Sequence, residues 1–361
     1  MRDLKIAIYA LAKNEAHNVP RFLDTTKDAD TVIVTDTGST DDTVALLQAG
    51  GAVVHTANIL PWRFDTAFNC ALCNVPPDTD ICIKLDLDEV IYSANGRHWR
   101  DELQELWTPG ISSIRYWYTW SWHVPGQIPA MRFRTVNVHA RTGFFWRHPG
   151  HATPYNCGTG KSADAKHFEI HHYMEKKKRP DYIALLQMAV AENKCPRTIF
   201  YLGREHFFRK EYKQCINLMM DYLEHPDTYW KEEKADAMRM IGLSWEQFGQ
   251  IDTATGWLSR AVAECPKTRD TWWALAAFFH RHKDFLGGWW AVSKCLAITD
   301  RNALWCGQTA DAWHDLPYAI AADCALQAGQ PDAAVRLIEK AIQLNPHGDQ
   351  TKAIAKMIGV M

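Results

Sequence analysis

The sequence lacks the features that mark several common classes of protein. No apolar run approaches the roughly 20 residues that cross a membrane, and residues 1–5 hold no apolar leader. We therefore expect a soluble, cytoplasmic protein without a membrane span. Neither Gly-x-Gly-x-x-Gly nor Gly-x-x-x-x-Gly-Lys-Ser/Thr occurs, which excludes the usual glycine-rich phosphate loops. The net charge of −2 excludes a strongly basic or acidic protein as a whole.

Cysteine occurs without the spacing of a zinc site or a disulfide ladder. Cys70 and Cys73 form a single Cys-x-x-Cys within an expected helix, and no second pair completes a zinc site. The ten cysteines show no regular spacing. Most are expected to be buried thiols, which suits a reducing compartment.

Length and composition indicate a globular protein of two domains. The chain has 361 residues, of which 47% are hydrophobic and 12% aromatic. Charge is uneven along it: residues 132–179 hold ten Lys or Arg against three acids, a surplus of seven. This surplus favours an anionic partner, although a solvated basic face explains it equally well.

The stretch from Ile81 to Val90 organises the first half of the chain. An apolar run that predicts a buried strand ends in Asp86, Asp88 and Glu89. Residues two apart on an extended backbone project to the same side, so the two aspartates can converge on one point. Hard oxygen donors there suit Mg²⁺ or Mn²⁺. The alternative is a solvated Asp-rich turn.

Strands and helices alternate before this stretch. We expect strands over residues 5–11, 31–35 and 52–55, each followed by a polar segment and a helix. This alternation predicts an α/β domain with a mixed, mostly parallel sheet and helices on both faces. Polar side chains at the carboxyl ends of parallel strands meet at the edge where ligands of such sheets bind.

Four segments in this order resemble the motifs of family 2 glycosyltransferases of the GT-A fold. They are Lys13-Asn14-Glu15, residues 36–43, residues 64–69 and residues 85–89. The resemblance covers roughly residues 1–175. It implies that Glu15 and Asp36 contact the nucleoside of a nucleotide-sugar donor, with Asn69 in the third motif. It also implies that Asp86 reaches the ribose or the metal, and that Asp88 binds the metal bridging the diphosphate.

The segment after residue 110 is aromatic, basic and rich in histidine. Strands are expected over residues 111–122, 131–138 and 142–146, the last two as a hairpin, and half of the rings could stack on sugars or bases. In the family resembled, a late histidine completes the metal shell. His171 or His172 would be that ligand, and the spacing does not choose between them.

Two positions depart from the family pattern. Ala152 stands where inverting members carry an acidic base, and Phe68 replaces an arginine common before the matching Asn69. The base is therefore open between His151, an imidazole suited to neutral pH, and the carboxylate of Asp164.

The second half resembles a tetratricopeptide array. Residues 241–266 fit the pattern of this repeat, residues 321–346 repeat it 80 positions later, and looser copies begin near residues 202 and 272. Such an array buries its core between neighbouring helix pairs and presents a concave face, which makes a protein partner an expectation. We predict domains at residues 1–179 and 180–361.

These features predict a metal-dependent glycosyltransferase with a nucleotide-sugar donor, a UDP-sugar in the first instance, and Mn²⁺ or Mg²⁺ as its cofactor. The acceptor would be a hydroxyl of a macromolecule: hydroxymethyl-pyrimidine in DNA, as the basic and aromatic segment suggests, or otherwise a protein, peptide or polysaccharide. The alternative is a non-catalytic helical-repeat binding or scaffold protein with a degenerate nucleotide-sugar domain. Nucleotidyl transfer on a similar sheet would require the glycine-rich loop that is missing.

Overall fold

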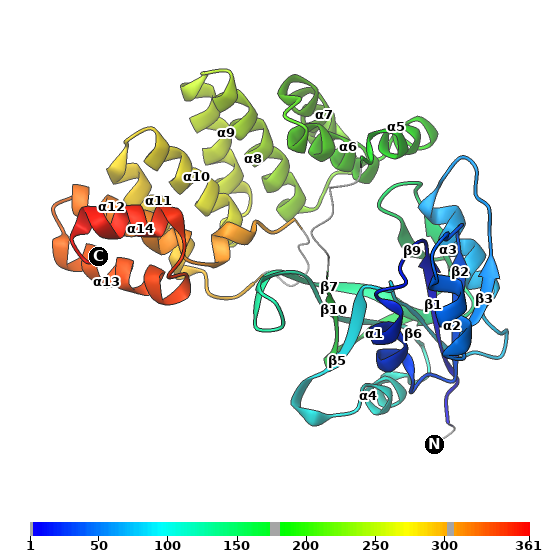
Figure 1. Ribbon diagram of the computed structural model, residues 1–361. Helices are drawn as coiled ribbons and strands as arrows, with labels where there is room; N and C mark the ends of the chain where they lie inside the picture. The colour runs from blue at the N-terminus through cyan, green and yellow to red at the C-terminus, as the bar shows by residue number, and fades with distance from the viewer. Residues whose placement is uncertain (1–2, 174–180, 302–306) are drawn as a thin grey trace. The chain divides into compact units, whose positions relative to one another are not determined.

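The computed structural model describes residues 3–173, 181–301 and 307–361. An eight-stranded mixed sheet with helices comes first and a run of helices follows (Figure 1). This order confirms the predicted fold class. The chain forms two compact units, Met1–Ser121 with Phe133–Glu192 (the sheet unit) and Trp122–Arg132 with Asn193–Met361 (the helical unit). The predicted boundary between residues 179 and 180, and the basic run at 176–179, lie outside the described residues.

The parallel half of the sheet is built from the predicted apolar runs. Its strands are β1 (Ile6–Ala12), β2 (Thr31–Asp36), β3 (Val53–Thr56) and β4 (Ile81–Lys84), and the helices between them are α1 (Val19–Thr26), α2 (Thr43–Ala49) and α3 (Phe64–Cys73). Strand β1 pairs in parallel with both β2 and β4, and β2 pairs with β3. The carboxyl ends of these strands therefore share one edge of the sheet.

The rest of the sheet is mixed in direction. It contains β5 (Glu89–Ser93), β6 (Ile111–Val124), β7 (Ile128–Ala140) and β10 (Lys161–His172), with η1 (Ala94–Gly96) and α4 (Trp99–Leu106) between β5 and β6. Strand β10 lies between β6 and β5 in the order β3-β2-β1-β4-β7-β6-β10-β5. It runs parallel to β6 and antiparallel to β5, which sets His172 opposite Glu89.

The expected hairpin of residues 131–138 with 142–146 is wrong. Strand β8 (Phe144–Arg147) pairs with β9 (Thr153–Asn156) in a separate two-stranded ribbon. The Asn69 side chain holds Trp146 against α3, with Asn69 Nδ2 donating to Trp146 O at 2.9 Å and Trp146 N donating to Asn69 Oδ1 at 2.7 Å. These bonds use the main-chain groups that a ladder with β7 would need.

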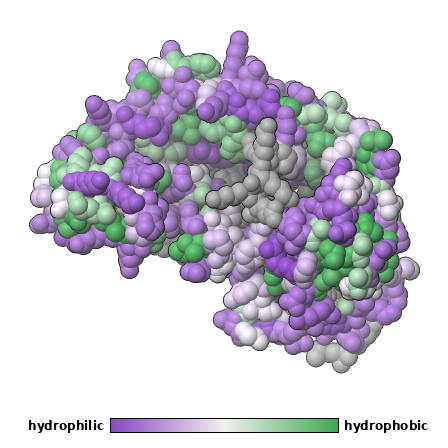
Figure 2. Space-filling model, viewed as in Figure 1, coloured by the Kyte–Doolittle hydropathy of each residue, from purple (hydrophilic) through white to green (hydrophobic). Residues whose placement is uncertain are grey.

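Helices cover both faces of the sheet, as side-chain alternation along β1 requires. Ile6 and Ile8 pack in one cluster with residues of α1, α2 and α4, while Ala7 and Tyr9 pack in another with α3. Each fully buried side chain of this size contributes roughly 1.5–3 kcal/mol relative to exposure. The visible surface is mainly hydrophilic, with hydrophobic residues scattered over it (Figure 2).

The helical segments follow the predicted repeats. They are α5 (Ile183–Glu192) in the sheet unit, and α6 (Pro196–Phe208), α7 (Tyr212–Glu224), α8 (Lys231–Gln247), α9 (Ile251–Glu264), α10 (Arg269–Arg281), α11 (Phe285–Ala297), η2 (Ala310–Trp313), α12 (Leu316–Gln327), α13 (Pro331–Leu344) and α14 (Asp349–Ile358) in the helical unit. None of the helices in the described part of the chain combines the length and apolarity of a membrane crossing.

Close helix pairing explains the glycines of the repeat pattern. A Cβ atom at Gly242 in α8 would lie 2.8 Å from Leu258 Cγ in α9, and one at Gly203 in α6 would lie 2.9 Å from Met219 Cε in α7. Neither position has room for a side chain without displacement of its neighbour. The predicted repeats are thus the helix pairs α6/α7, α8/α9, α10/α11 and α12/α13.

Candidate functional site

The turn between β4 and β5 carries the three carboxylates that end the apolar run. Asp86 N donates to Glu89 Oε2 at 2.7 Å, and Glu89 N donates to Asp86 O at 3.0 Å. Lys84, the last residue of β4, donates from Nζ to Asp86 Oδ2. These bonds fix the conformation of the turn, so the Asp86 and Asp88 side chains are held in place before any ligand binds.

Glu89 holds the turn in place from the interior of the domain. No role was predicted for it from the sequence. It is buried, and its Oε1 accepts a hydrogen bond from the Tyr118 hydroxyl at 2.6 Å. Lys84 Nζ lies 3.9 Å from Glu89 Oε2. Burial raises the pKa of Glu89, against the opposing charge of Lys84. Lys84 is a charged residue in an otherwise apolar strand, two residues before Asp86. A lysine at such a position indicates a buried carboxylate partner nearby, and this signal could have identified Glu89.

Asp88 is paired with His172, the last residue of β10. His172 Nε2 lies 3.0 Å from Asp88 Oδ2, and Nδ1 lies 2.9 Å from the carbonyl oxygen of Trp120. Because a carbonyl can only accept, Nδ1 carries a proton and Nε2 is the nitrogen that faces Asp88. Burial disfavours the charged imidazole, but the hydrogen bond and charge of Asp88 outweigh it and raise the pKa of His172 to about 9. The pKa of Asp88 is lowered: burial alone would raise it, and His172 overcomes that effect.

The structure separates the two histidines that spacing could not distinguish. Neighbouring residues on a strand face opposite sides of the sheet. His171 accordingly lies away from Asp88: its Nε2 is 3.1 Å from Glu169 Oε2, and its ring stacks on Tyr92 with centroids 4.7 Å apart. Of the two histidines predicted as metal ligands, His172 is the one that contacts Asp88.

Asp88 and His172 supply one oxygen and one nitrogen donor, a set that suits Mn²⁺ and is tolerated by Mg²⁺. Asp86 lies on the same turn and carries a further carboxylate. Among the residues that the structure describes, no group of three or more His, Cys, Asp or Glu side chains could hold a metal ion by itself. The residues therefore fit a cation that takes most of its ligands from water and a bound diphosphate, as Mg²⁺ and Mn²⁺ commonly do.

The loops after β1 and β2 are fastened to each other beside this turn. Asp36 is buried, and its carboxylate accepts hydrogen bonds from Gly38 N at 3.0 Å and Ser39 N at 3.1 Å. Glu15 Oε2 accepts from Asn18 Nδ2 at 2.7 Å. Thr40 N donates to Asn14 Oδ1 at 2.7 Å across the two loops. Both predicted nucleoside-contacting acids thus also shape the strand ends that carry them.

A chain of contacts links these loops to the Asp88 turn. Arg21 Nη2 donates to Asn18 Oδ1 at 2.6 Å, and its guanidinium lies 5.3 Å from the ring centroid of Tyr173. Tyr173 N donates to Asp88 O at 2.9 Å. The structure therefore brings Glu15, Asp36, Asp86, Asp88 and His172 to one end of the sheet.

The contacts described for Asn69, His151 and Asp164 are with other segments of the chain. The Asn69 amide is occupied by the main chain of Trp146, as described above. His151 lies in the loop after β8, with a φ of 51° and its ring centroid 5.6 Å from that of Tyr182. Asp164 lies eight residues before His172 on β10, roughly 25 Å along the strand. It is paired with Arg134 Nη1 at 3.0 Å and with Arg115 Nε at 3.6 Å.

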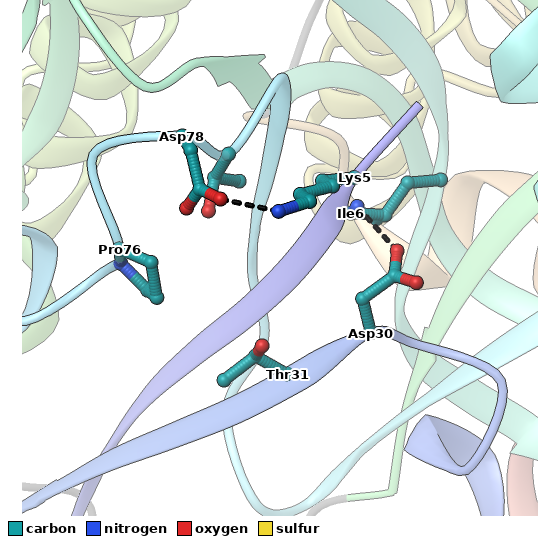
Figure 3. Close-up of a pocket in the computed structure, with 7 residues that line it drawn as sticks. Lys5, Ile6, Asp30, Thr31, Pro76 and Asp78 are labelled. Carbon is teal, nitrogen blue, oxygen red and sulfur yellow. Dashed lines mark hydrogen bonds and ion pairs between the residues drawn. The ribbon is translucent and has the colours of Figure 1, made fainter. Parts of the chain in front are cut away.

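Two surface hollows lie away from the Asp86–Asp88 turn. One of about 330 Å³ lies at the amino ends of β1 and β2, where Lys5 pairs with Asp78 and Ile6 N donates to Asp30 (Figure 3). Another of about 510 Å³ lies between the end of β3 and α3 and includes Thr56 and Cys70. Neither hollow includes Asp86, Asp88 or His172, and the charged side chains of the first, Lys5, Asp30 and Asp78, lie at the opposite ends of the strands.

No family model matches the chain. No curated protein matches it. Solved structures similar to it include pilF of Pseudomonas aeruginosa, with 11% identity and a TM-score of 0.40 over 48% of this chain and 72% of that one. YrrB, a TPR protein with an unusual peptide-binding site, has 14% identity and a TM-score of 0.37 over 48% and 81%. TTC0263, a thermophilic TPR protein of Thermus thermophilus, has 13% identity and a TM-score of 0.35 over 50% and 89%.

Proposed function

We propose that the protein is a glycosyltransferase that takes its sugar from a nucleotide-sugar donor, in the first instance a UDP-sugar. The observation that carries this proposal is the pair of Asp88 and His172, held on a fixed turn beside the loops of Glu15 and Asp36. The acceptor is proposed to be a hydroxyl of a macromolecule: a hydroxymethyl-pyrimidine in DNA, or otherwise a protein, peptide or polysaccharide. The surplus of Lys and Arg over acids in residues 132–179 supports an anionic acceptor.

The divalent cation would be held by Asp88 and His172, with Asp86 beside it. When bound, Mn²⁺ or Mg²⁺ neutralises the charge of a leaving diphosphate. The remaining work falls to the chain itself. Glu89 and Tyr118 keep the turn in place, Lys84 compensates the charge of Asp86, and the carbonyl of Trp120 sets the tautomer of His172.

We assign proton abstraction from the acceptor hydroxyl to His151 in preference to Asp164. The carboxylate of Asp164 is neutralised by two arginines and lies far along β10 from the Asp88 turn. An imidazole is a common general base. The loop of His151 is fixed next to α3, since Phe64 N donates to Pro149 O at 3.0 Å.

A donor-hydrolysis assay tests the proposal. The protein is incubated with Mn²⁺ and a panel of UDP-, GDP- and dTDP-sugars, and release of the nucleoside diphosphate is measured for the wild type and Asp88→Asn. Metal-dependent release by the wild type that is lost in the variant supports the assignment. Asp24→Asn, at an exposed carboxylate in α1 that pairs with Lys27, serves as the control and should keep full activity.

The second candidate is a helical-repeat binding or scaffold protein whose sheet unit does not catalyse transfer. Two observations favour it. Asp86 and Asp88 each have a cationic partner within the chain, Lys84 for Asp86 and His172 for Asp88. The helical unit also makes up about half of the chain and repeats a helix pair suited to partner binding. Mn²⁺-dependent nucleotide binding without turnover of any donor in the panel would support this candidate over the first.

A further inference from the structure

Aromatic rings of β6 form a row that leads from the core to the Asp88 turn. Tyr116 is fully buried, Tyr118 is 6% exposed and Trp120 is 39% exposed. They share one face of the strand because they are two residues apart. The rings of Tyr116 and Tyr118 pack in the core. Trp120 is the exposed member of the row and lies next to His172 of the charged cluster.

Trp120 contacts His172, the candidate metal ligand, through both its ring and its main chain. Its ring stacks on His172 with centroids 4.5 Å apart and an interplanar angle of 26°, and its carbonyl accepts from His172 Nδ1. One face of the indole therefore supports the imidazole that faces Asp88. Tyr118 lies beside the indole, with ring centroids 6.2 Å apart, and Trp120 remains 39% exposed to solvent. A large exposed ring next to a charged pair gains little for folding, but it offers a flat apolar surface to a ligand.

We propose, on the basis of the function proposed above, that the exposed surface of Trp120 is the platform on which the transferred sugar of the donor stacks. In a nucleotide sugar the sugar is bonded directly to the distal phosphate. A diphosphate held through a cation at Asp88 and His172 would therefore have its sugar next to Trp120, whose ring stacks on His172. Sugar rings present a face of C–H groups that packs on an aromatic ring, as bases do.

The order of the strands supports the sugar over the nucleobase as the occupant. Strands β1 and β2, which carry Glu15 and Asp36 at their ends, lie on one side of β4. Strands β6 and β10, which carry Trp120 and His172, lie on the other side. The nucleoside and the sugar are separated by the diphosphate. A donor with its nucleoside at the first pair of loops therefore has its sugar on the side of Trp120.

Binding measurements with and without the sugar test this platform. The dissociation constants of UDP and of UDP-glucose, UDP-galactose and UDP-N-acetylglucosamine are measured by calorimetry with Mn²⁺ for the wild type, Trp120→Leu and Trp120→Phe. Trp120→Leu should weaken the best-bound UDP-sugar about tenfold, as expected for the loss of one stacking contact. Its affinity for UDP and for Mn²⁺ alone should fall clearly less than its affinity for the UDP-sugar, because the main-chain carbonyl of residue 120, which accepts from His172 Nδ1, is kept. Trp120→Phe should recover part of the loss because it keeps a ring.

Tyr92 provides a matched control. It is also exposed and also stacks on a histidine, His171, but on the side of the sheet away from Asp88. Tyr92→Leu should leave all of these affinities unchanged. If Trp120→Leu weakens UDP and UDP-sugars equally, or weakens neither, the platform is wrong while the proposed function stands. If the wild type binds no nucleoside diphosphate with Mn²⁺, the proposed function itself fails, and this inference fails with it.

Discussion

In the sheet unit several buried charged side chains gather around the turn after β4, whereas in the helical unit the buried charged side chains are spaced along the repeats. Lys84, Glu89 and His172 contact one another or the same turn. In the helical unit, Arg269 at the start of α10 instead donates to the carbonyls of Ala312 at 2.7 Å and Ile298 at 2.9 Å. Further along the chain, the Thr351 hydroxyl in α14 donates to Asp315 at 2.5 Å.

We interpret this difference as follows: buried charges in the helical unit stabilise the fold, and those around the Asp86–Asp88 turn bind a ligand. A buried polar group costs free energy unless it is paired, and in the helical unit Arg269 and Asp315 pair with groups of neighbouring elements. The charged side chains around the Asp86–Asp88 turn do not link successive elements in this way. Such a cluster is the arrangement expected where a charged ligand binds. Substitutions in the two units should accordingly differ in what they change.

The largest effect is expected at Asp88. Asp88→Asn keeps the shape of the side chain but removes the charge that attracts the cation, so Mn²⁺ affinity and donor hydrolysis should fall by at least about 100-fold. The melting temperature should change little, because the turn is held by Glu89 and Lys84. Calorimetry and thermal unfolding on the same samples separate the two effects. A variant that binds Mn²⁺ like the wild type would contradict the assignment.

Arg269→Ala should show the opposite profile. It removes the donor of two main-chain carbonyls in the helical unit and should lower the free energy of unfolding by about 3 kcal/mol. Urea denaturation measures this loss, and the affinity for Mn²⁺ and UDP should stay unchanged. Arg281→Ala is the control: Arg281 is exposed and pairs with Glu246, so its loss should cost less than about 1 kcal/mol. Equal losses in the two variants would mean that Arg269 is not a structural joint.

Glu89→Gln sharpens the contrast within the sheet unit. Glutamine keeps an acceptor for the Tyr118 hydroxyl but removes the charge that compensates Lys84. We expect Mn²⁺ affinity to fall about tenfold through a misplaced Asp86–Asp88 turn, as is typical when a group that orients metal ligands is altered. Tyr118→Phe, which removes only the hydroxyl, should have a smaller effect. Unchanged Mn²⁺ affinity in Glu89→Gln would show that the turn does not depend on this carboxylate.

The smallest predicted effect concerns pH and lies in the helical unit. Burial raises the pKa of Glu233 in α8 to about 7, against the lowering effect of Tyr222. In the unfolded state Glu233 has its ordinary pKa of about 4.5, so between about pH 4.5 and pH 7 the folded state holds a proton that the unfolded state has released. The free energy of unfolding therefore falls as the pH rises from about 4.5 through 7. Between pH 6 and 8 the free energy of unfolding should drop by about 1 kcal/mol more in the wild type than in Glu233→Gln. Parallel curves for the two proteins would contradict this.

Features that depend on short-range patterns could be predicted from the sequence. The strands before residue 85, the Asp86–Asp88 turn and the helix pairs follow from apolar runs and repeats with periods visible along the chain. Glu15 and Asp36 were placed by the rule that parallel strands end at one edge, and the order of β2, β1 and β4 confirms that placement.

Features that depend on pairing between distant segments could not be predicted. The choice of His172 over His171 follows from the register of β10 against β5, and one residue of slip would exchange them. Asn69 is held by Trp146, 77 positions away, which also prevents the expected hairpin. The pairing of Asp164 with Arg134, 30 positions away in sequence, likewise depends on how distant strands pair.

The most direct test of the central claim is electron spin-echo envelope modulation of Mn²⁺ bound to the protein with UDP. If Asp88 and His172 hold the cation, the spectrum should show ¹⁴N modulation from a directly bound imidazole. This modulation should vanish in His172→Gln and persist in His171→Gln. A wild-type spectrum without nitrogen modulation, or one that loses it only in His171→Gln, would contradict the account.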